Sequence, residues 1–264
     1  KDKILKKKSI KLIKYDLRKK IDTSKIPKKV DFIIHFASNP NDRYSVTNRK
    51  ELLQENTLID INVFQLCSKI KYQKFIYASS SSVYDDNKLK IKNESLESKI
   101  NVPYEPDGLY GLGKLLSEKF LESSKINFII CRIFSIYGND SNTVINLWNN
   151  KIKNNKNIEI WKSDKINRSW LHIDDFVRAM IMICLSKSKI KYFNIASDEN
   201  LTLKEIINLF LSFHKNSNSK YTVKKNVDAG PKNRFGTRNN LNKIGFNQNI
   251  YLKDGIRLLN SKKI

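Results

Sequence analysis

Phe75-Ile-Tyr-Ala-Ser-Ser-Ser-Ser-Val-Tyr84 is the stretch of sequence that decides the fold of this chain. Its first four residues are apolar, and this is typical of a strand buried on both faces of a parallel sheet. We expect the strand to begin at Lys74. Residues 30–37 and 127–134 have the same character, and the segments 49–70 and 109–123 show the apolar periodicity of helices. Strands that alternate with helices of this length predict right-handed βαβ units. We therefore expect an α/β protein with a Rossmann-like, doubly wound parallel sheet.

The two ends of the chain extend this pattern in different ways. Residues 11–16 are expected to form a short strand that ends in Asp16. Beyond Gly138 the elements become shorter and mixed, with helices expected over 143–151 and 174–185 and an extended segment over 158–161. Asp174 is expected to cap the second of these helices, and Thr202 with Glu205 forms a capping-box pattern for a later one. This part of the chain predicts a smaller C-terminal α+β lobe.

Composition excludes several classes of protein. The net charge is +24 in 264 residues, but the lysines are scattered over every polar face, so we expect no nucleic-acid partner. No apolar run approaches the roughly 18–20 residues that cross a bilayer, so no membrane partner is expected. Cys67, Cys131 and Cys184 stand singly in apolar stretches, which predicts buried free thiols in a reducing, cytoplasmic setting. With only three histidines, no metal site is expected.

Tyr110-Gly-Leu-Gly-Lys114 follows the serine run at residues 79–82 and predicts a proton-transfer site. Strands of open α/β sheets bind ligands at their carboxyl edge, where Ser80 is expected to lie. Lys114 stands one helical turn after Tyr110, and an ammonium near a phenol favours the phenolate. The same tyrosine–lysine spacing occurs at Tyr15, Tyr84 and Tyr221. Only Tyr110 follows a serine-edged strand, so we predict Ser80, Tyr110 and Lys114 as the catalytic residues.

These motifs resemble the extended short-chain dehydrogenase/reductase family, in its NAD-dependent nucleotide-sugar epimerase/dehydratase branch. The resemblance rests on residues 30–37, on Asn56, on the serine strand 75–84 and on Tyr110-x-x-x-Lys114. It continues through Arg132-Ile-Phe-Ser-Ile-Tyr-Gly138 and Arg168-Ser-Trp-Leu-His-Ile-Asp-Asp175. All of these stand in the family's order along the chain.

The resemblance implies NAD as cofactor, a nucleotide sugar as substrate and a homodimer for the full-length form. The implied cofactor-binding residues are Asp16, Leu17, Phe36, Ala37, Ser38, Asn56, Ala78, Ser79, Tyr110, Lys114 and Ile133. The implied substrate-binding residues are Ser80, Ser81, Tyr110, Ser135 and Arg168, with Arg168 on the substrate diphosphate. Ser135 stands where the family usually has an asparagine. His35, His172 and Trp161 are expected to be packing residues.

The serine run also bears on the reaction. In the family's 4,6-dehydratases an aspartate and a glutamate follow the catalytic hydroxyl, whereas this chain has Ser81 and Ser82. The resemblance therefore implies a 4-epimerase of a UDP-sugar, which oxidises C4 transiently and returns the hydride. A dehydratase or reductase of the same family, or an inactive truncated member, are the alternatives.

The family's glycine-rich turn has no counterpart here, so the resemblance implies that the first βαβ portion of the sheet is missing. We expect residues 30–37 to form an exposed edge strand and these 264 residues to bind NAD poorly. Residues 1–138, with about 166–188, are expected to form the NAD-binding domain. Residues 139–165 and 189–264 are expected to form the substrate-binding lobe.

Overall fold

The fold is built on a parallel sheet, as predicted. The computed structural model describes residues 10–39, 49–84, 106–139, 143–225 and 233–261. The central sheet has the order β1-β2-β3-β8, and every pairing in it is parallel. Its strands are β1 (Phe32–His35), β2 (Lys74–Ser80), β3 (Phe128–Ile133) and β8 (Tyr192–Ile195).

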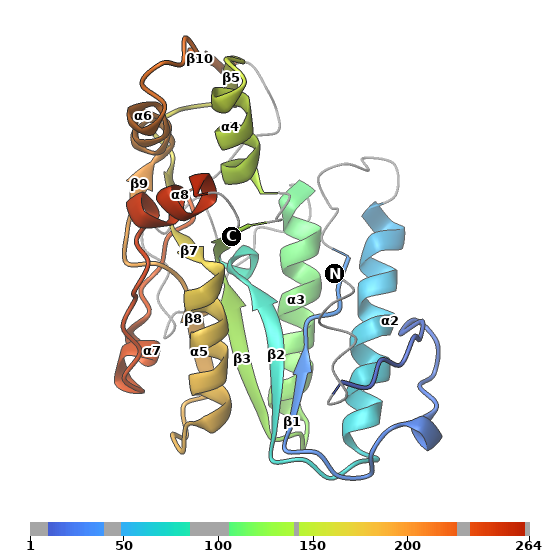
Figure 1. The fold of residues 1–264 in the computed structure, drawn as a ribbon. Coiled ribbons are helices and arrows are strands. Elements are labelled where there is room, and N and C mark those ends of the chain that lie inside the picture. The colour runs from blue at the N-terminus through green and yellow to red at the C-terminus, as the bar shows by residue number, and fades with distance from the viewer. Residues whose placement is uncertain (1–9, 40–48, 85–105, 140–142, 226–232, 262–264) are drawn as a thin grey trace.

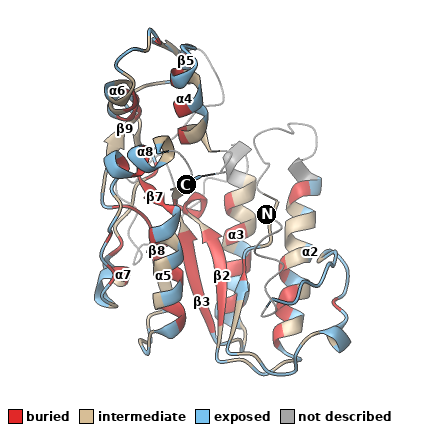
Figure 2. Cartoon of the chain, viewed as in Figure 1, coloured by how far each residue is buried: buried red, intermediate tan, exposed pale blue. Residues whose placement is uncertain are grey.

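Helices cover both faces of this sheet (Figure 1), which confirms the doubly wound α/β class. One face packs against α2 (Arg49–Cys67) and α3 (Pro106–Ser123), and the other against α5 (Ile173–Leu185) and α7 (Asn239–Lys243). The strand period of two explains the division. In β2, Phe75 and Tyr77 belong to the core under α2 and α3, whereas Ile76 belongs to the core under α5. All three side chains are fully buried, and Figure 2 shows β2 coloured mostly as buried.

A further core lies in the C-terminal part of the chain. Its side chains come from α4 (Val144–Lys153), α6 (Leu203–Phe213), α8 (Leu252–Asn260), β4 (Ser135–Tyr137), β5 (Ile158–Trp161), β7 (Trp170–His172), β9 (Leu201–Thr202) and β10 (Tyr221–Lys224). The short strand β6 (Asn167–Arg168) pairs with β9. The capping box predicted for Thr202 and Glu205 opens α6. Short 3-10 turns occur at η1 (Thr23–Lys25) and η3 (Ser81–Val83).

Four expectations need correction. Residues 11–16 form no strand in the described structure and are exposed, because no described strand pairs with them. His172, and not Asp174, caps α5, since its ring accepts from the Asp174 amide. Trp161 is 48% exposed on β5 and is not a core residue.

The fourth correction concerns the boundary expected at residue 189. β8 pairs with β3 in the central sheet, and α7 packs on β8. Residues 192–195 therefore belong to the sheet and not to the C-terminal lobe. The assignment of one part to the cofactor and the other to the substrate stays a prediction.

Three further observations bear on the remaining expectations. β1 is the outer strand of the described sheet; Ile34 within it is 43% exposed, and Phe36 directly after it is 49% exposed. The three cysteines are buried and unpaired, as predicted. Among the described residues no helix is long and apolar enough to cross a membrane.

Candidate active site

The serine strand ends in a tight turn. Ser80 is the last residue of β2 and caps η3, where its Oγ accepts a hydrogen bond from the Ser82 amide over 3.1 Å. Ser81 and Ser82 are buried, and Ser80 is half-buried. The turn thus fixes the hydroxyl of Ser80 at the carboxyl edge of the sheet, where the sequence predicted it.

Helix α3 brings Tyr110 to this turn. A Cβ atom added at Gly111 would lie 2.1 Å from the carbonyl oxygen of Ser82. Glycine therefore allows the first turn of α3 to touch the backbone of η3. Tyr110 precedes Gly111, so its backbone lies in the helical turn that packs on η3.

Replacing Gly111 by Ala is expected to push the helix away from the serine turn. The new methyl would meet backbone, which cannot rotate aside, so we expect a loss of about 1–3 kcal/mol in unfolding free energy. Gly113→Ala in the same helix is the matched control, because its Cβ would meet only the flexible end of Leu53 at 2.9 Å. Urea unfolding of both variants checks this, and equal losses would contradict the close packing of α3 on η3.

A pocket between α2 and α3 collects the predicted Tyr110, Lys114 and Asn56. Its lining comes from Leu52, Leu53, Asn56, Thr57 and Asp60 on α2 and from Leu109, Tyr110, Gly113 and Lys114 on α3. The pocket therefore has an apolar wall with a phenol, an amine, an amide and a carboxylate in it.

Lys114 is buried, with a relative exposure of 5%. Its Nζ lies 4.7 Å from the ring centroid of Tyr77 and 6.0 Å from that of Tyr110. Burial lowers the pKa of Lys114, while the nearby charges of Asp60 and Glu118 act in the opposite direction. The amine and the Tyr110 ring thus lie in the same pocket.

The predicted cofactor residues after β1 lie at the carboxyl end of that strand. Asn56 holds this segment, because its Oδ1 accepts from the Asn39 amide at 2.7 Å and its Nδ2 donates to the Asn39 carbonyl at 3.0 Å. Phe36 is exposed and contacts Phe176 with a centroid separation of 5.9 Å. Ala37 and Ser38 are half-buried.

The other residues that were predicted to bind the cofactor do not line the pocket between α2 and α3. Ala78 and Ser79 are buried in β2, and Ser79 donates to Glu118; Ile133 ends β3. Asp16 is exposed and pairs with Arg18 at 3.0 Å, and the hydrogen bond from Arg18 lowers the pKa of Asp16 to about 2. Leu17 packs against the core under α2.

Two arginines are joined by a backbone bridge, and one of them reaches the serine turn. Arg168, on β6, is buried and forms a parallel backbone bridge with Arg234. Arg234 is also buried, and its guanidinium donates to Ser82 Oγ. Ser135, on β4, pairs with Trp170 of β7, two residues beyond Arg168. No motif in the sequence indicated Arg234, which the structure brings to the turn from 152 residues away.

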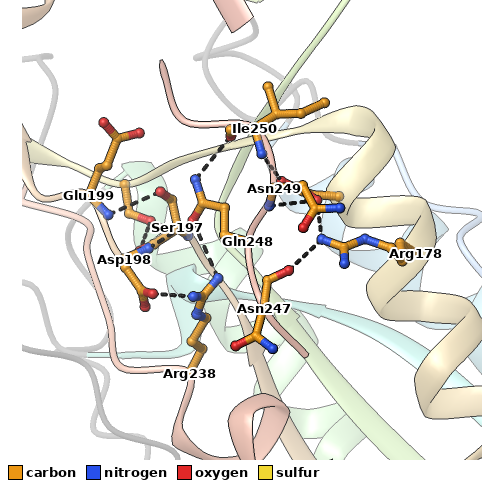
Figure 3. Close-up of polar contacts among 11 residues, drawn as sticks. Arg178, Ser197, Asp198, Glu199, Arg238, Asn247, Gln248, Asn249 and Ile250 are labelled. Atoms are coloured by element: carbon orange, nitrogen blue, oxygen red, sulfur yellow. Dashed lines mark hydrogen bonds and ion pairs between the residues drawn. The ribbon is translucent and has the colours of Figure 1, made fainter. Parts of the chain in front are cut away.

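A polar cluster holds residues 247–250 against helix α5 and against the segment that follows β8 (Figure 3). Asp175 accepts from the amides of Asn249 and Ile250 at 3.0 Å and 2.8 Å, and Gln248 accepts from the amide of Asp198 at 3.1 Å. Arg238 forms an ion pair with Asp198. Arg238 thus connects to Asp198 in this cluster, and Arg234 donates to Ser82 in the serine turn.

The amino-acid sequence is similar to those of a known epimerase and a known dehydratase. GDP-mannose 3,5-epimerase of Arabidopsis thaliana is 27% identical over 260 residues, which are 92% of this chain and 67% of that protein. dTDP-D-glucose 4,6-dehydratase of Dictyostelium discoideum is 32% identical over 197 residues, covering 69% of this chain and 45% of that protein.

Solved structures share the fold. UDP-glucuronic acid 4-epimerase from Bacillus cereus, solved with UDP-glucuronic acid and NAD, has a TM-score of 0.75 and 21% identity, covering 88% of this chain and 76% of that chain. The sequence profile of one family matches residues 1–196, which are most of the chain. The chain belongs to the NAD dependent epimerase/dehydratase family.

Proposed function

We propose that this protein is an NAD-dependent nucleotide-sugar epimerase that inverts C4 of a UDP-sugar. The observation that carries the proposal is the placement of Tyr110 and Lys114 in one pocket beside a turn made of serines. The family membership supports the wider class of epimerases and dehydratases. Ser81 and Ser82 stand where the 4,6-dehydratases have an aspartate and a glutamate, and they therefore favour an epimerase within that class.

The pocket residues fit a nicotinamide cofactor. Tyr110 and Lys114 offer a phenol and an amine to a ribose, and Leu52 and Leu109 offer an apolar wall to a ring. Asn56 fixes the backbone after β1, which would line the same cleft. When bound, NAD supplies the acceptor and donor of a hydride.

The residues of this chain then have separate tasks. Tyr110 removes the proton from the C4 hydroxyl as hydride leaves C4, and returns it when hydride comes back to the opposite face. Lys114, as an ammonium, stabilises the tyrosinate. Ser80 Oγ would donate a hydrogen bond to the same sugar oxygen.

Arg168 and Arg234 are proposed to bind the substrate diphosphate. Guanidinium groups form paired hydrogen bonds with phosphate oxygens. Arg234 donates to Ser82 Oγ, and its backbone bridges that of Arg168. A diphosphate held there would place the sugar toward Ser80 and Tyr110. This arrangement supports a nucleotide sugar over a free sugar as substrate.

Product analysis tests the proposal. Because we expect weak binding of the cofactor, the protein is incubated with a large excess of NAD and with UDP-glucose, UDP-glucuronic acid or UDP-N-acetylglucosamine, and the sugars are identified by proton NMR. We expect at least one substrate to give its C4 epimer. A 4-keto-6-deoxy sugar as product would refute the epimerase and favour the dehydratase reaction.

A further inference from the structure

Asp60 is a buried carboxylate that the reaction described above does not use. It is 4% exposed, lies one turn after Asn56 on α2, and lines the pocket that contains Tyr110 and Lys114. A carboxylate is costly to bury unless donors surround it. Its presence in this wall therefore needs an explanation.

Three side chains from three elements surround this carboxylate. His35 Nε2 on β1 lies 2.8 Å from Oδ1, and Tyr77 on β2 and Ser117 on α3 each donate to Oδ2 over 2.6 Å. Burial raises the pKa of Asp60, but the hydrogen bond from His35 and the charge of Lys114 outweigh it, so the net pKa lies below its usual value. These three contacts therefore favour the ionised form of Asp60.

Two of these donors connect Asp60 to Lys114. Tyr77 binds Asp60 through its hydroxyl, and its ring lies 4.7 Å beneath Lys114 Nζ. Ser117 follows Lys114 by three residues on α3, so both side chains lie on the same side of the helix. The Asp60 carboxylate thus holds in place the Tyr77 ring that Lys114 contacts.

The other carboxylate near Lys114 is already neutralised. Glu118 is fully buried and forms a paired ion bridge with Arg132, at 2.7 Å and 3.1 Å. Around Lys114, α3 also contributes the Tyr110 phenol and β2 contributes the Tyr77 phenol. Asp60 lines the same pocket as Lys114, and its charge opposes the effect of desolvation on the amine.

We propose that Asp60 is a positioning residue, whose carboxylate keeps the Lys114 amine protonated beside Tyr110. This inference rests on the proposed function, because it concerns the same tyrosine–lysine pair. A buried amine without an opposite charge favours its neutral form. A neutral amine would no longer stabilise the tyrosinate that removes the sugar proton.

The first test needs no substrate. The lysine side chains are followed by proton–carbon NMR during a pH titration, and the Lys114 signal is identified by its absence in Lys114→Met. In Asp60→Asn, which removes the charge with little change in shape, we expect the Lys114 midpoint to fall by about 1 pH unit. Glu122→Gln, which removes a charge from the far end of the same helix, is the control and should leave the midpoint in place.

The second test is the pH profile of turnover. Because loss of the Asp60 charge lets Lys114 deprotonate at lower pH, the alkaline limb of kcat should move to lower pH by the same amount, with KM little changed. A purely structural role would lower activity at all pH values without moving this limb. Asp60→Ser removes the charge with a smaller side chain and serves if Asp60→Asn does not fold.

The outcomes separate the two proposals. An unchanged Lys114 midpoint in folded Asp60→Asn or Asp60→Ser overturns the role of Asp60, whatever the activity. A lowered midpoint without any turnover of UDP-sugars supports the role of Asp60 and refutes the proposed function instead.

Discussion

Replacing Tyr110 by Phe is expected to reduce kcat for the UDP-sugar by about 10²–10⁴-fold, the usual contribution of a positioned acid–base group. The ring would keep its place beside Lys114, which lies 6.0 Å from its centroid. Substrate affinity should therefore change little. Product NMR gives the rate, and calorimetric titration with the UDP-sugar gives the dissociation constant.

Tyr15→Phe is the matched control for this variant. Tyr15 also precedes a lysine by four residues, but it is 42% exposed and its hydroxyl donates to the Lys20 carbonyl. Its kcat should equal that of the wild type. A Tyr110→Phe enzyme that retains near-normal turnover would remove Tyr110 from the reaction.

Arg132→Ala is expected to cost about 3–5 kcal/mol in unfolding free energy, because it leaves the carboxylate of Glu118 buried without its partner. The side chains of Arg132 and Glu118 are 6% and 0% exposed, and Arg132 also donates to the Tyr84 hydroxyl at 3.0 Å. Tyr84 in turn donates to Asn194 on β8 at 2.8 Å. The loss should appear as a lower urea midpoint.

An exposed pair provides the comparison. Arg257 and Asp254 are 2.8 Å apart with side chains 58% and 53% exposed, so Arg257→Ala should cost at most about 1 kcal/mol. Replacing both Arg132 and Glu118 by apolar residues should recover much of the loss, since no charge then stays buried. Equal losses of unfolding free energy in Arg132→Ala and Arg257→Ala would contradict the expected contribution of the buried pair to stability.

Local patterns in the sequence were sufficient to predict the central sheet and helix α3. The apolar run before Ser79 predicted β2, and the position of Tyr110 after that run predicted its place beside the serine turn. Both depend on burial and spacing along a short stretch of chain. The capping box at Thr202 was predicted for the same reason.

Contacts between distant residues could not be predicted in this way. Arg234 reaches Ser82 across 152 residues, and Asp60 meets His35 across 25; neither pair leaves a spacing signal. The strand expected over 11–16 was wrong because strand propensity has no effect without a neighbour to pair with, and Leu12 there is 70% exposed. His172 caps α5 in place of Asp174 because the helix begins one residue earlier than the acidic pair suggested.

Deuterium placed at C4 of UDP-glucuronic acid provides the most direct test of the proposed reaction. The protein, NAD and this substrate are incubated in ordinary water, and the product is examined by proton and deuterium NMR. Transient oxidation at C4 with return of the same hydride predicts the C4 epimer with deuterium still at C4. Loss of deuterium from C4, inversion at C3 or C5, or a product without the C6 oxygen would contradict it.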